Sequence, residues 1–175
     1  FRRVLFRSQH TADLFIGHTM AMGRGFCSYE RLAYLRFPDD DIGFLTDALL
    51  ARGLKKDRWF VTVHAHEPGY EGANEASLRD QDPASFWEAI VHIIEKLGGQ
   101  VVRLGHPAMR ELPKTEGLID LSRQPADVLL QAFAISRSRF LLAGPSGPSS
   151  VAACFHVPAA IVNTLDVGPE NDRAV

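Results

Sequence analysis

The sequence predicts an α/β fold, a parallel β-sheet with helices on both faces. Short apolar runs typical of buried strands alternate along the chain with longer segments whose apolar residues recur at helical spacing. Small and polar residues follow several of these runs directly, as at Gly144-Pro-Ser-Gly-Pro148. In a parallel sheet the carboxyl ends of the strands lie at one edge, so we expect these polar residues to lie close together.

The first three elements are a helix, a strand and a second helix. The acidic residues 39–41 after Pro38 favour a helix start, and the apolar run over 59–63 is typical of a buried strand. A proline after the long polar loop favours a second helix start, because its fixed φ suits the first turn. The expected elements are a helix that starts at 38–41 and stops before Gly53, a strand over 59–63 and a helix over 83–97.

The remaining elements continue the alternation. Two short apolar runs predict two further strands, and Asp127 begins a helix with an apolar stripe. The chain then closes with a strand, a Gly/Ser-rich turn, a short helix and a last strand. The expected bounds are strands over 101–104 and 118–121, a helix over 127–136, a strand over 140–143, a turn over 144–150 and a strand over 159–162.

The chain divides into three parts. Residues 1–8 match what one reading frame of a common sequencing-library adapter would encode, so they are set aside as an artefact. We interpret residues 9–38 as an incomplete N-terminal segment and residues 39–175 as the α/β domain of a longer protein. Without residues 1–8 the chain has 16 basic and 21 acidic residues, a formal net charge of −5 instead of −2. This balance argues against nucleic acid as a partner.

Cysteine content and hydropathy indicate the compartment. The two cysteines, Cys27 and Cys154, give no disulfide framework, which favours a reducing environment. No apolar run of the sequence approaches the roughly 20 residues that span a bilayer. We therefore expect a cytoplasmic protein, and a peripheral association with the cytoplasmic membrane face through regions beyond this sequence stays open.

Three polar clusters fall at the expected carboxyl ends of strands. They are His64, His66 and Glu67; Arg103, Gly105 and His106; and Ser146, Gly147, Ser149 and Ser150. The last cluster is a turn of small residues before a helix, which brings backbone N–H groups and the positive end of the helix dipole to one place. This arrangement suits a phosphate or a diphosphate. Convergence of all three clusters is a stronger indication of a site than any one of them.

The clusters also have other interpretations. A His-x-His motif after a strand can hold a metal ion, which leaves open a metal-dependent hydrolase that uses His64 and His66. The same histidines can contact a phosphate, transfer a proton, or only hydrogen-bond to loop backbone. Arg103 is expected to meet either an anionic ligand or a carboxylate such as Asp120, because an unpaired buried guanidinium is costly. The turn after Gly144 departs from the spacing of a serine-hydrolase elbow, and no P-loop lysine is present.

A series of motifs runs in order along residues 37–163. It comprises Trp59-Phe-Val-x-Val-His64, Glu67-Pro-Gly-Tyr70, Arg79-Asp80, Gly98-Gly99-x-Val-Val-Arg103-x-Gly105, Leu118-Ile119-Asp120, Asp127-Val128, Gly144-x-Ser146-Gly147 and Val157-Pro158. Together these motifs resemble a family of bacterial glycosyltransferases that is distantly similar to the GDP-fucose-dependent fucosyltransferases. One position departs from the family pattern, because His66 stands where the family has an arginine that is expected to hold the donor diphosphate.

The resemblance implies a Rossmann-like, nucleotide-sugar-binding lobe of the two-lobed GT-B fold. It implies a hexosyl- or fucosyltransferase-like enzyme that moves a sugar from a nucleotide-diphosphate donor to a glycan acceptor in polysaccharide or cell-surface glycan synthesis, with no metal or other cofactor. Catalytic roles are expected for His64, His66 and Glu67, and donor contacts for Tyr70, Arg79, Arg103, Gly105, Ser146, Gly147, Ser149 and Ser150. A non-catalytic sugar-nucleotide-binding module stays open, because histidine replaces the family's arginine.

Overall fold

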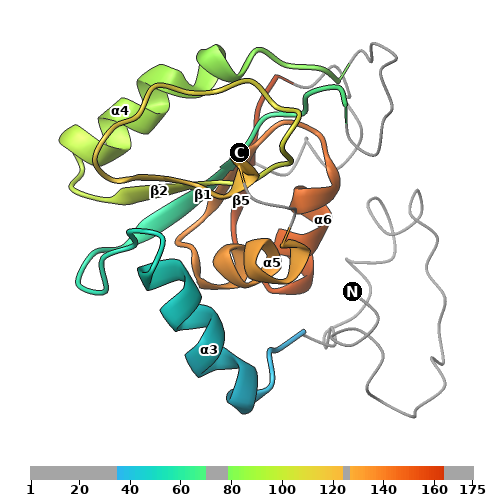
Figure 1. The fold of residues 1–175 in the computed structure, drawn as a ribbon. Helices are drawn as coiled ribbons and strands as arrows, with labels where there is room; N and C mark the ends of the chain where they lie inside the picture. The colour runs from blue at the N-terminus through green and yellow to red at the C-terminus, as the bar shows by residue number, and fades with distance from the viewer. Residues whose placement is uncertain (1–34, 70–78, 124–126, 164–175) are drawn as a thin grey trace, which may run out of the picture.

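Five parallel strands form one sheet in the order β3-β2-β1-β4-β5, with α4 on one face and α3, α5 and α6 on the other (Figure 1). The structure, a computed structural model, describes residues 35–69, 79–123 and 127–163. The elements are α3 (Asp39–Leu50), β1 (Phe60–His64), η3 (Pro83–Phe86), α4 (Trp87–Glu95), β2 (Gln100–Arg103), β3 (Leu118–Asp120), η4 (Leu121–Arg123), α5 (Val128–Arg137), β4 (Leu141–Ala143), α6 (Gly147–Cys154) and β5 (Ala159–Ile161). The predicted fold class is confirmed.

Alternate side chains of the central strands enter two separate hydrophobic cores. Val61, Val63 and Val101 pack in one core with apolar residues of η3 and α4. Phe60 and Val102 belong to the other core, with apolar residues of α3, α5 and α6. Successive residues of a strand point to opposite faces, so a sheet covered on both faces needs apolar residues at nearly every position. This requirement explains why the strands appear in the sequence as continuous apolar runs.

The chain before α3 packs onto the second core. Phe37 is buried, stacks on Phe155 with ring centroids 5.3 Å apart, and meets the edge of Phe133 at 5.2 Å. The backbone N–H of Leu35 donates to the carbonyl of Cys154 at 3.1 Å. The packed domain therefore includes residues that the sequence assigned to the segment before residue 39.

Two element boundaries near α4 and β1 differ from the prediction. The strand expected over 59–63 begins at Phe60, and the ring of Trp59 instead lies 4.9 Å from the guanidinium carbon of Arg139. The helix expected over 83–97 begins as a 3₁₀ turn and ends at Glu95. Leu97 therefore lies beyond the helix, with 53% of its surface exposed.

The Gly/Ser-rich turn is shorter than predicted. Helix α6 begins at Gly147, because Ser146 already has the extended backbone of an N-cap residue, with φ −157° and ψ 170°. The turn expected over 144–150 thus ends at Ser146. Ser149 and Ser150 belong to the first turn of the helix, so their backbone N–H groups point along its axis.

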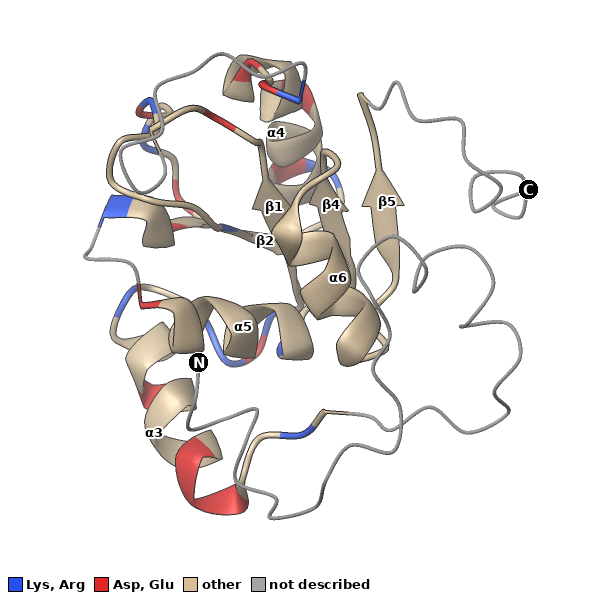
Figure 2. Cartoon of the chain, turned by 90° about the vertical axis from the view of Figure 1, so that its right-hand side faces the viewer, with Lys and Arg blue, Asp and Glu red and all other residues tan. Residues whose placement is uncertain are grey.

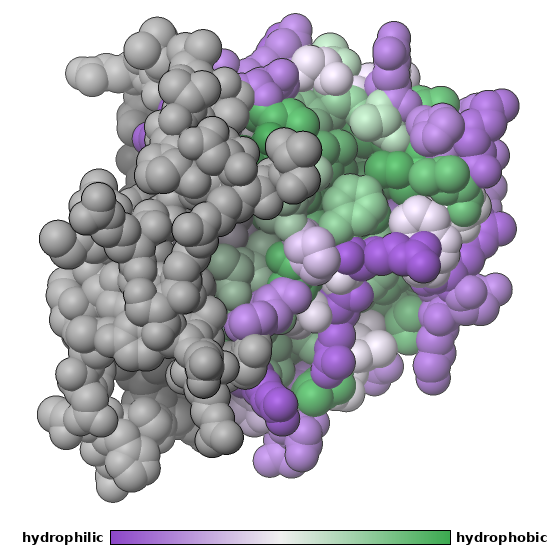
Figure 3. Space-filling model, turned by 180° about the vertical axis from the view of Figure 1, so that it is seen from behind, coloured by the Kyte–Doolittle hydropathy of each residue, from purple (hydrophilic) through white to green (hydrophobic). Residues whose placement is uncertain are grey.

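Charged side chains are unevenly spread over the helices. Acidic residues 39–41 mark the first turn of α3 in red, whereas α6 and most of α5 are uncharged (Figure 2). Seen from behind, hydrophilic side chains lie along the right-hand rim and across the middle of the visible face, with hydrophobic side chains between them (Figure 3). Within the described ranges no helix is long and apolar enough to cross a membrane.

Candidate functional site at the strand ends

The order of the strands places a crevice between β1 and β4. The chain adds β2 and β3 on one side of β1, and β4 and β5 on the other. In open parallel sheets this reversal leaves a crevice at the carboxyl ends of the two central strands, where ligands bind. His64 ends β1, and Gly144 directly follows β4. Both residues therefore lie at the edge where a ligand is expected.

A cavity of about 590 Å³ opens at this edge. Residues of all three predicted clusters line it: His64, His66 and Glu67 after β1, Gly105 and His106 after β2, and Ser146, Gly147 and Ser150 after β4. The wall contributed by α5 and α6 is largely apolar, with Leu129, Ala132, Ile135 and Val151 among its residues. The expected convergence of the clusters is found, and it gives the cavity a polar edge and an apolar wall.

Four predicted donor-binding residues are not among the described lining residues. Arg103 is buried and does not line the cavity, and Arg79 is exposed outside it. The hydroxyl of Ser149 donates to the carbonyl of Ser146 at 2.6 Å. Tyr70 lies outside the described residues. The donor contacts of these four residues stay predictions.

His64 is a buried, neutral imidazole with a fixed partner. Its Nδ1 lies 3.0 Å from the hydroxyl oxygen of Ser146, and that oxygen lies 3.2 Å from the carbonyl of Gly144. The hydroxyl has one proton: if it donates to Gly144 the imidazole proton is on Nδ1, and if it donates to Nδ1 of His64 the imidazole proton is on Nε2. Burial above all, and then the charges of His66, His106 and Arg103, lower the pKa of His64 from 6.5 to about 4.

The start of α6 offers fewer N–H groups to a phosphate than predicted. The hydroxyl of Ser146 makes no capping bond to the helix. Pro148 has no N–H, and the N–H of Ser149 donates to the carbonyl of Ser146 at 3.1 Å. Gly147 lines the cavity, and a side chain there would meet nothing within 4 Å. A phosphate at this position would therefore depend on Gly147, the hydroxyl of Ser150 and the helix dipole.

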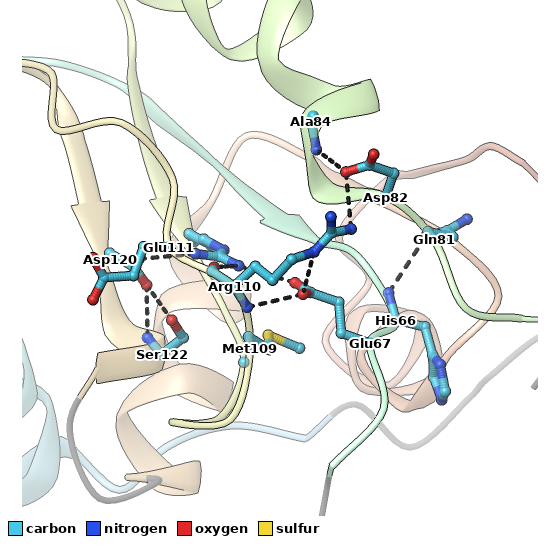
Figure 4. A network of polar contacts seen from close by, with 12 residues as sticks. His66, Glu67, Gln81, Asp82, Ala84, Met109, Arg110, Glu111, Asp120 and Ser122 are labelled. Atoms are coloured by element: carbon cyan, nitrogen blue, oxygen red, sulfur yellow. Dashed lines mark hydrogen bonds and ion pairs between the residues drawn. The ribbon is translucent and has the colours of Figure 1, made fainter. Parts of the chain in front are cut away.

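His66 is paired with a carboxylate that the sequence analysis did not assign to the site. Its Nδ1 lies 2.9 Å from Oδ1 of Asp80, and the two side chains are 26% and 22% exposed. In Figure 4 the ring of His66 points away from the contact between Glu67 and Arg110. The motif Arg79-Asp80 was the only signal for this carboxylate, because nothing in the spacing connects it to His66.

Glu67 and Arg103 belong to a buried ion-pair network beside the cavity. Arg103 contacts Oε1 of Glu67 and Oδ2 of Asp120, each at 3.0 Å, and donates to the carbonyl of Arg110 at 2.7 Å. The second oxygen of Glu67 accepts the backbone N–H of Arg110 at 2.9 Å, and the side chain of Arg110 extends toward Glu67 and Asp82 (Figure 4). Arg103 thus has the carboxylate partner Asp120 that the sequence offered as an alternative. The catalytic role of Glu67 stays a prediction, and both of its oxygens have structural partners.

The loop after β2 is held by a paired amide contact. The N–H of Gly105 donates to Oε1 of Gln131, and Nε2 of Gln131 donates to the carbonyl of Gly105, each at 2.8 Å. Gly105 has φ +152°, and a Cβ atom there would collide with the sulfur of Met109. The geometry of this side of the cavity therefore requires glycine.

We expect Gly105→Ala to lower the free energy of unfolding by about 1–3 kcal/mol, because the new methyl group overpacks the loop. Gly43 provides the matched control, since a Cβ there meets nothing within 4 Å and the residue lies within α3. Gly43→Ala is expected to raise stability by about 0.5–1 kcal/mol. Urea unfolding curves measure both values. Equal effects of the two substitutions would contradict the steric argument.

Charged groups at the cavity are few. No lysine or arginine is among the described residues that line it. Over the same described ranges, no group of three or more His, Cys, Asp or Glu side chains could hold a metal ion. Among the described residues, the electrostatics of the cavity thus come from its histidines, the ion pair of Glu67 with the buried Arg103 beside it, and the positive end of the α6 dipole.

Comparison with solved structures finds similar folds among glycosyltransferases. The chain superposes on the glycosyl transferase family 9 protein from Veillonella parvula DSM 2008 with a TM-score of 0.52 and 16% identity, over 72% of this chain and 35% of that one. A dodecameric iron-containing heptosyltransferase, TibC, solved in complex with ADP-D-β-D-heptose, gives a TM-score of 0.46 and 13% identity, over 62% of this chain and 28% of that one. No protein-family model matches the chain, and no curated protein matches it.

The first of these likenesses shows the fold. It agrees with the expected Rossmann-like lobe of the GT-B type, and the chain spans about a third of the length of that family 9 protein. Neither neighbour is described as a fucosyltransferase. The GDP-fucose part of the resemblance therefore stays a prediction.

Proposed function

We propose that this chain is the nucleotide-sugar-binding lobe of a glycosyltransferase, which moves a sugar from a nucleotide-diphosphate donor to a glycan acceptor. The observation that carries the proposal is the convergence of three strand-end clusters on one cavity at the point where the strand order reverses. The likeness of the fold to a glycosyl transferase family 9 protein supports the same class of reaction. The wider role in polysaccharide or cell-surface glycan synthesis, in the cytoplasm, belongs to the proposal.

The cavity suits a ligand with one polar and one apolar part. The strand-end edge carries His64, His66 and Ser146, which can hydrogen-bond to phosphate and sugar oxygens. The opposite wall is formed by aliphatic side chains of α5 and α6, and it can bury a nucleoside ring. We propose that the diphosphate lies at the start of α6, where the N–H of Gly147 and the helix dipole favour negative charge.

Departure of the nucleoside diphosphate is the charge-forming step of such a transfer. Described residues bring no permanent cation to the cavity, so hydrogen bonds and dipoles must stabilise the leaving group. His64 lies beside Ser146 at the start of α6, and as a neutral imidazole with its proton on Nε2 it can donate a hydrogen bond to the leaving oxygen atoms. His66 lies further along the same loop and can accept the proton of the acceptor hydroxyl.

A charge introduced at Ser150 tests where the diphosphate binds. We expect Ser150→Glu to weaken the binding of nucleoside diphosphates and their sugars at least about tenfold, because a carboxylate would repel the phosphates across a low-dielectric cavity. Ser150→Gln has nearly the same shape as Ser150→Glu without the charge, so it shows the effect of losing the hydroxyl and adding bulk, and we expect the Glu variant to bind at least about tenfold more weakly than the Gln variant. Isothermal titration calorimetry with GDP-, UDP- and ADP-sugars measures these affinities. Equal affinity of the Glu and Gln variants would contradict the assignment of α6 as the phosphate site.

A non-catalytic sugar-nucleotide-binding module is the second candidate. The absence of lysine and arginine from the described lining residues favours it, since tight stabilisation of a leaving diphosphate usually employs cations. An enzyme releases nucleoside diphosphate from a bound sugar nucleotide, slowly with water and faster with an acceptor. Binding without any release in the full-length protein would support the module.

A further inference from the structure

We propose that Asp80 and His66 form the proton-accepting pair of the transfer reaction, with His66 taking the proton of the attacking hydroxyl and Asp80 acting as its positioning residue. This inference rests on the proposed glycosyl transfer and adds an assignment for Asp80. It also gives the two histidines after β1 different roles: His64 contacts the leaving group, and His66 contacts the acceptor.

The partners of the two histidines differ in kind. His64 is 8% exposed and pairs through Nδ1 with a neutral hydroxyl that is itself bonded to a carbonyl. An imidazolium formed there would have no counter-charge at Nδ1. His66 pairs through Nδ1 with the carboxylate of Asp80 at 2.9 Å, and its side chain is 26% exposed. A carboxylate at this position stabilises the imidazolium that forms when Nε2 accepts a proton.

The segment that carries Asp80 is fastened to the loop after β1. The N–H of Gln81 donates to the carbonyl of His66 at 2.8 Å, and the N–H of His66 donates to Oε1 of Gln81 at 3.4 Å. The side-chain nitrogen of Gln81 reaches the carbonyl of Val162 beyond β5 at 3.3 Å. A Cβ atom on Gly144 would collide with the Gln81 amide, so the two strand ends and this segment fit closely. The backbone next to Asp80 is therefore held beside His66 by one backbone hydrogen bond and by the side-chain amide of Gln81.

Among the described residues, the other ionisable groups near His66 belong to the ends of two strands. His64 and Glu67 lie at the end of β1, and the buried Arg103 and His106 lie at the end of β2. Glu67 is already neutralised by Arg103 at 3.0 Å. Of the described carboxylates at this edge, Asp80 is the one that contacts His66, so it is the group that orients the ring and leaves Nε2 for the acceptor.

The step is a simple displacement. The oxygen of the attacking hydroxyl forms a bond to the anomeric carbon, and the bond from that carbon to the diphosphate oxygen breaks. The bonding electrons leave with the nucleoside diphosphate, and the hydroxyl proton passes to Nε2 of His66. Asp80 keeps its charge throughout and holds the Nδ1 proton of the imidazolium.

The test compares a nucleophile that must lose a proton with one that has none to lose. In the full-length protein, release of nucleoside diphosphate from GDP-, UDP- and ADP-sugars is measured with water and with sodium azide as acceptors. Asp80→Asn keeps the shape of the side chain and removes its charge. We expect this variant to slow release with water about 10- to 100-fold, since general base catalysis contributes about 10²–10⁴-fold. Release with azide and the Kd of the donor should stay within about threefold of native values, and Asp80→Glu should recover part of the rate with water.

The outcomes separate this inference from the proposed function. Native protein that binds no sugar nucleotide would overturn both. Normal donor binding with an unchanged rate in Asp80→Asn would overturn the role of Asp80 alone. An equal loss with water and with azide would also overturn it, because it would show that the substitution disturbs the site as a whole.

Discussion

Arg103→Met is expected to lower the free energy of unfolding by about 3–5 kcal/mol. The guanidinium is 2% exposed and joins Glu67 to Asp120, so its removal leaves each carboxylate with only a more distant arginine, Arg110 or Arg123, at 3.6 Å. Breaking a buried ion pair from one side costs about this much, because the remaining charge stays desolvated. Chemical denaturation monitored by tryptophan fluorescence measures the change, and Trp59 and Trp87 both pack against the same sheet.

An exposed ion pair supplies the control for this prediction. Lys55 pairs with Glu116 at the surface, and Lys55→Met is expected to leave stability essentially unchanged. A loss below about 1 kcal/mol in Arg103→Met would contradict the network interpretation. The affinity of Arg103→Lys, which keeps the charge, for nucleotide sugars tests whether Arg103 contacts the donor diphosphate. An affinity within about threefold of native favours a purely structural arginine, and a loss above tenfold favours direct contact with the diphosphate.

Acidification is expected to destabilise the protein through His64. The folded pKa of His64 is lowered to about 4 from an ordinary value of 6.5, so the unfolded chain binds this proton more readily than the folded one. Stability from this group is therefore fully present above about pH 6.5 and is lost as pH falls toward 4. The shift corresponds to about 3 kcal/mol between the two limits.

Comparison of variants isolates this contribution from other titrating groups. His64→Asn keeps an amide that can hydrogen-bond near the position of Nδ1 and cannot titrate, so its stability should fall less between pH 7 and pH 4.5 than that of the native protein. His92 lies exposed on α4, and His92→Asn should retain the native pH dependence. Unfolding curves collected at several pH values give the difference. Parallel pH profiles for native and His64→Asn protein would contradict the buried, neutral state of His64.

The location of the candidate site and the pairing of Arg103 with Asp120 could be predicted from the sequence, but the partners of His64 and His66 could not. Polar clusters after apolar runs converge in any parallel sheet, and the cavity is lined by residues of all three. The hydroxyl of Ser146 pairs with His64, 82 residues away, and no local pattern encodes this contact. The same holds for His66 and Asp80, 14 residues apart across a loop. These contacts depend on how loops fold back, which sequence spacing does not specify.

The sequence by itself determined the alternation of strands and helices, the parallel sheet and the edge at which the cavity opens. Those features follow from side-chain periodicity and from strand direction, both of which are local properties of the chain. The tertiary structure alone decided that Arg103 neutralises Glu67 as well as Asp120, that α6 begins at Gly147, and that His64 and His66 have different partners. Buried charges and hydroxyls take whatever partner lies within hydrogen-bond distance, and only the folded chain fixes those distances.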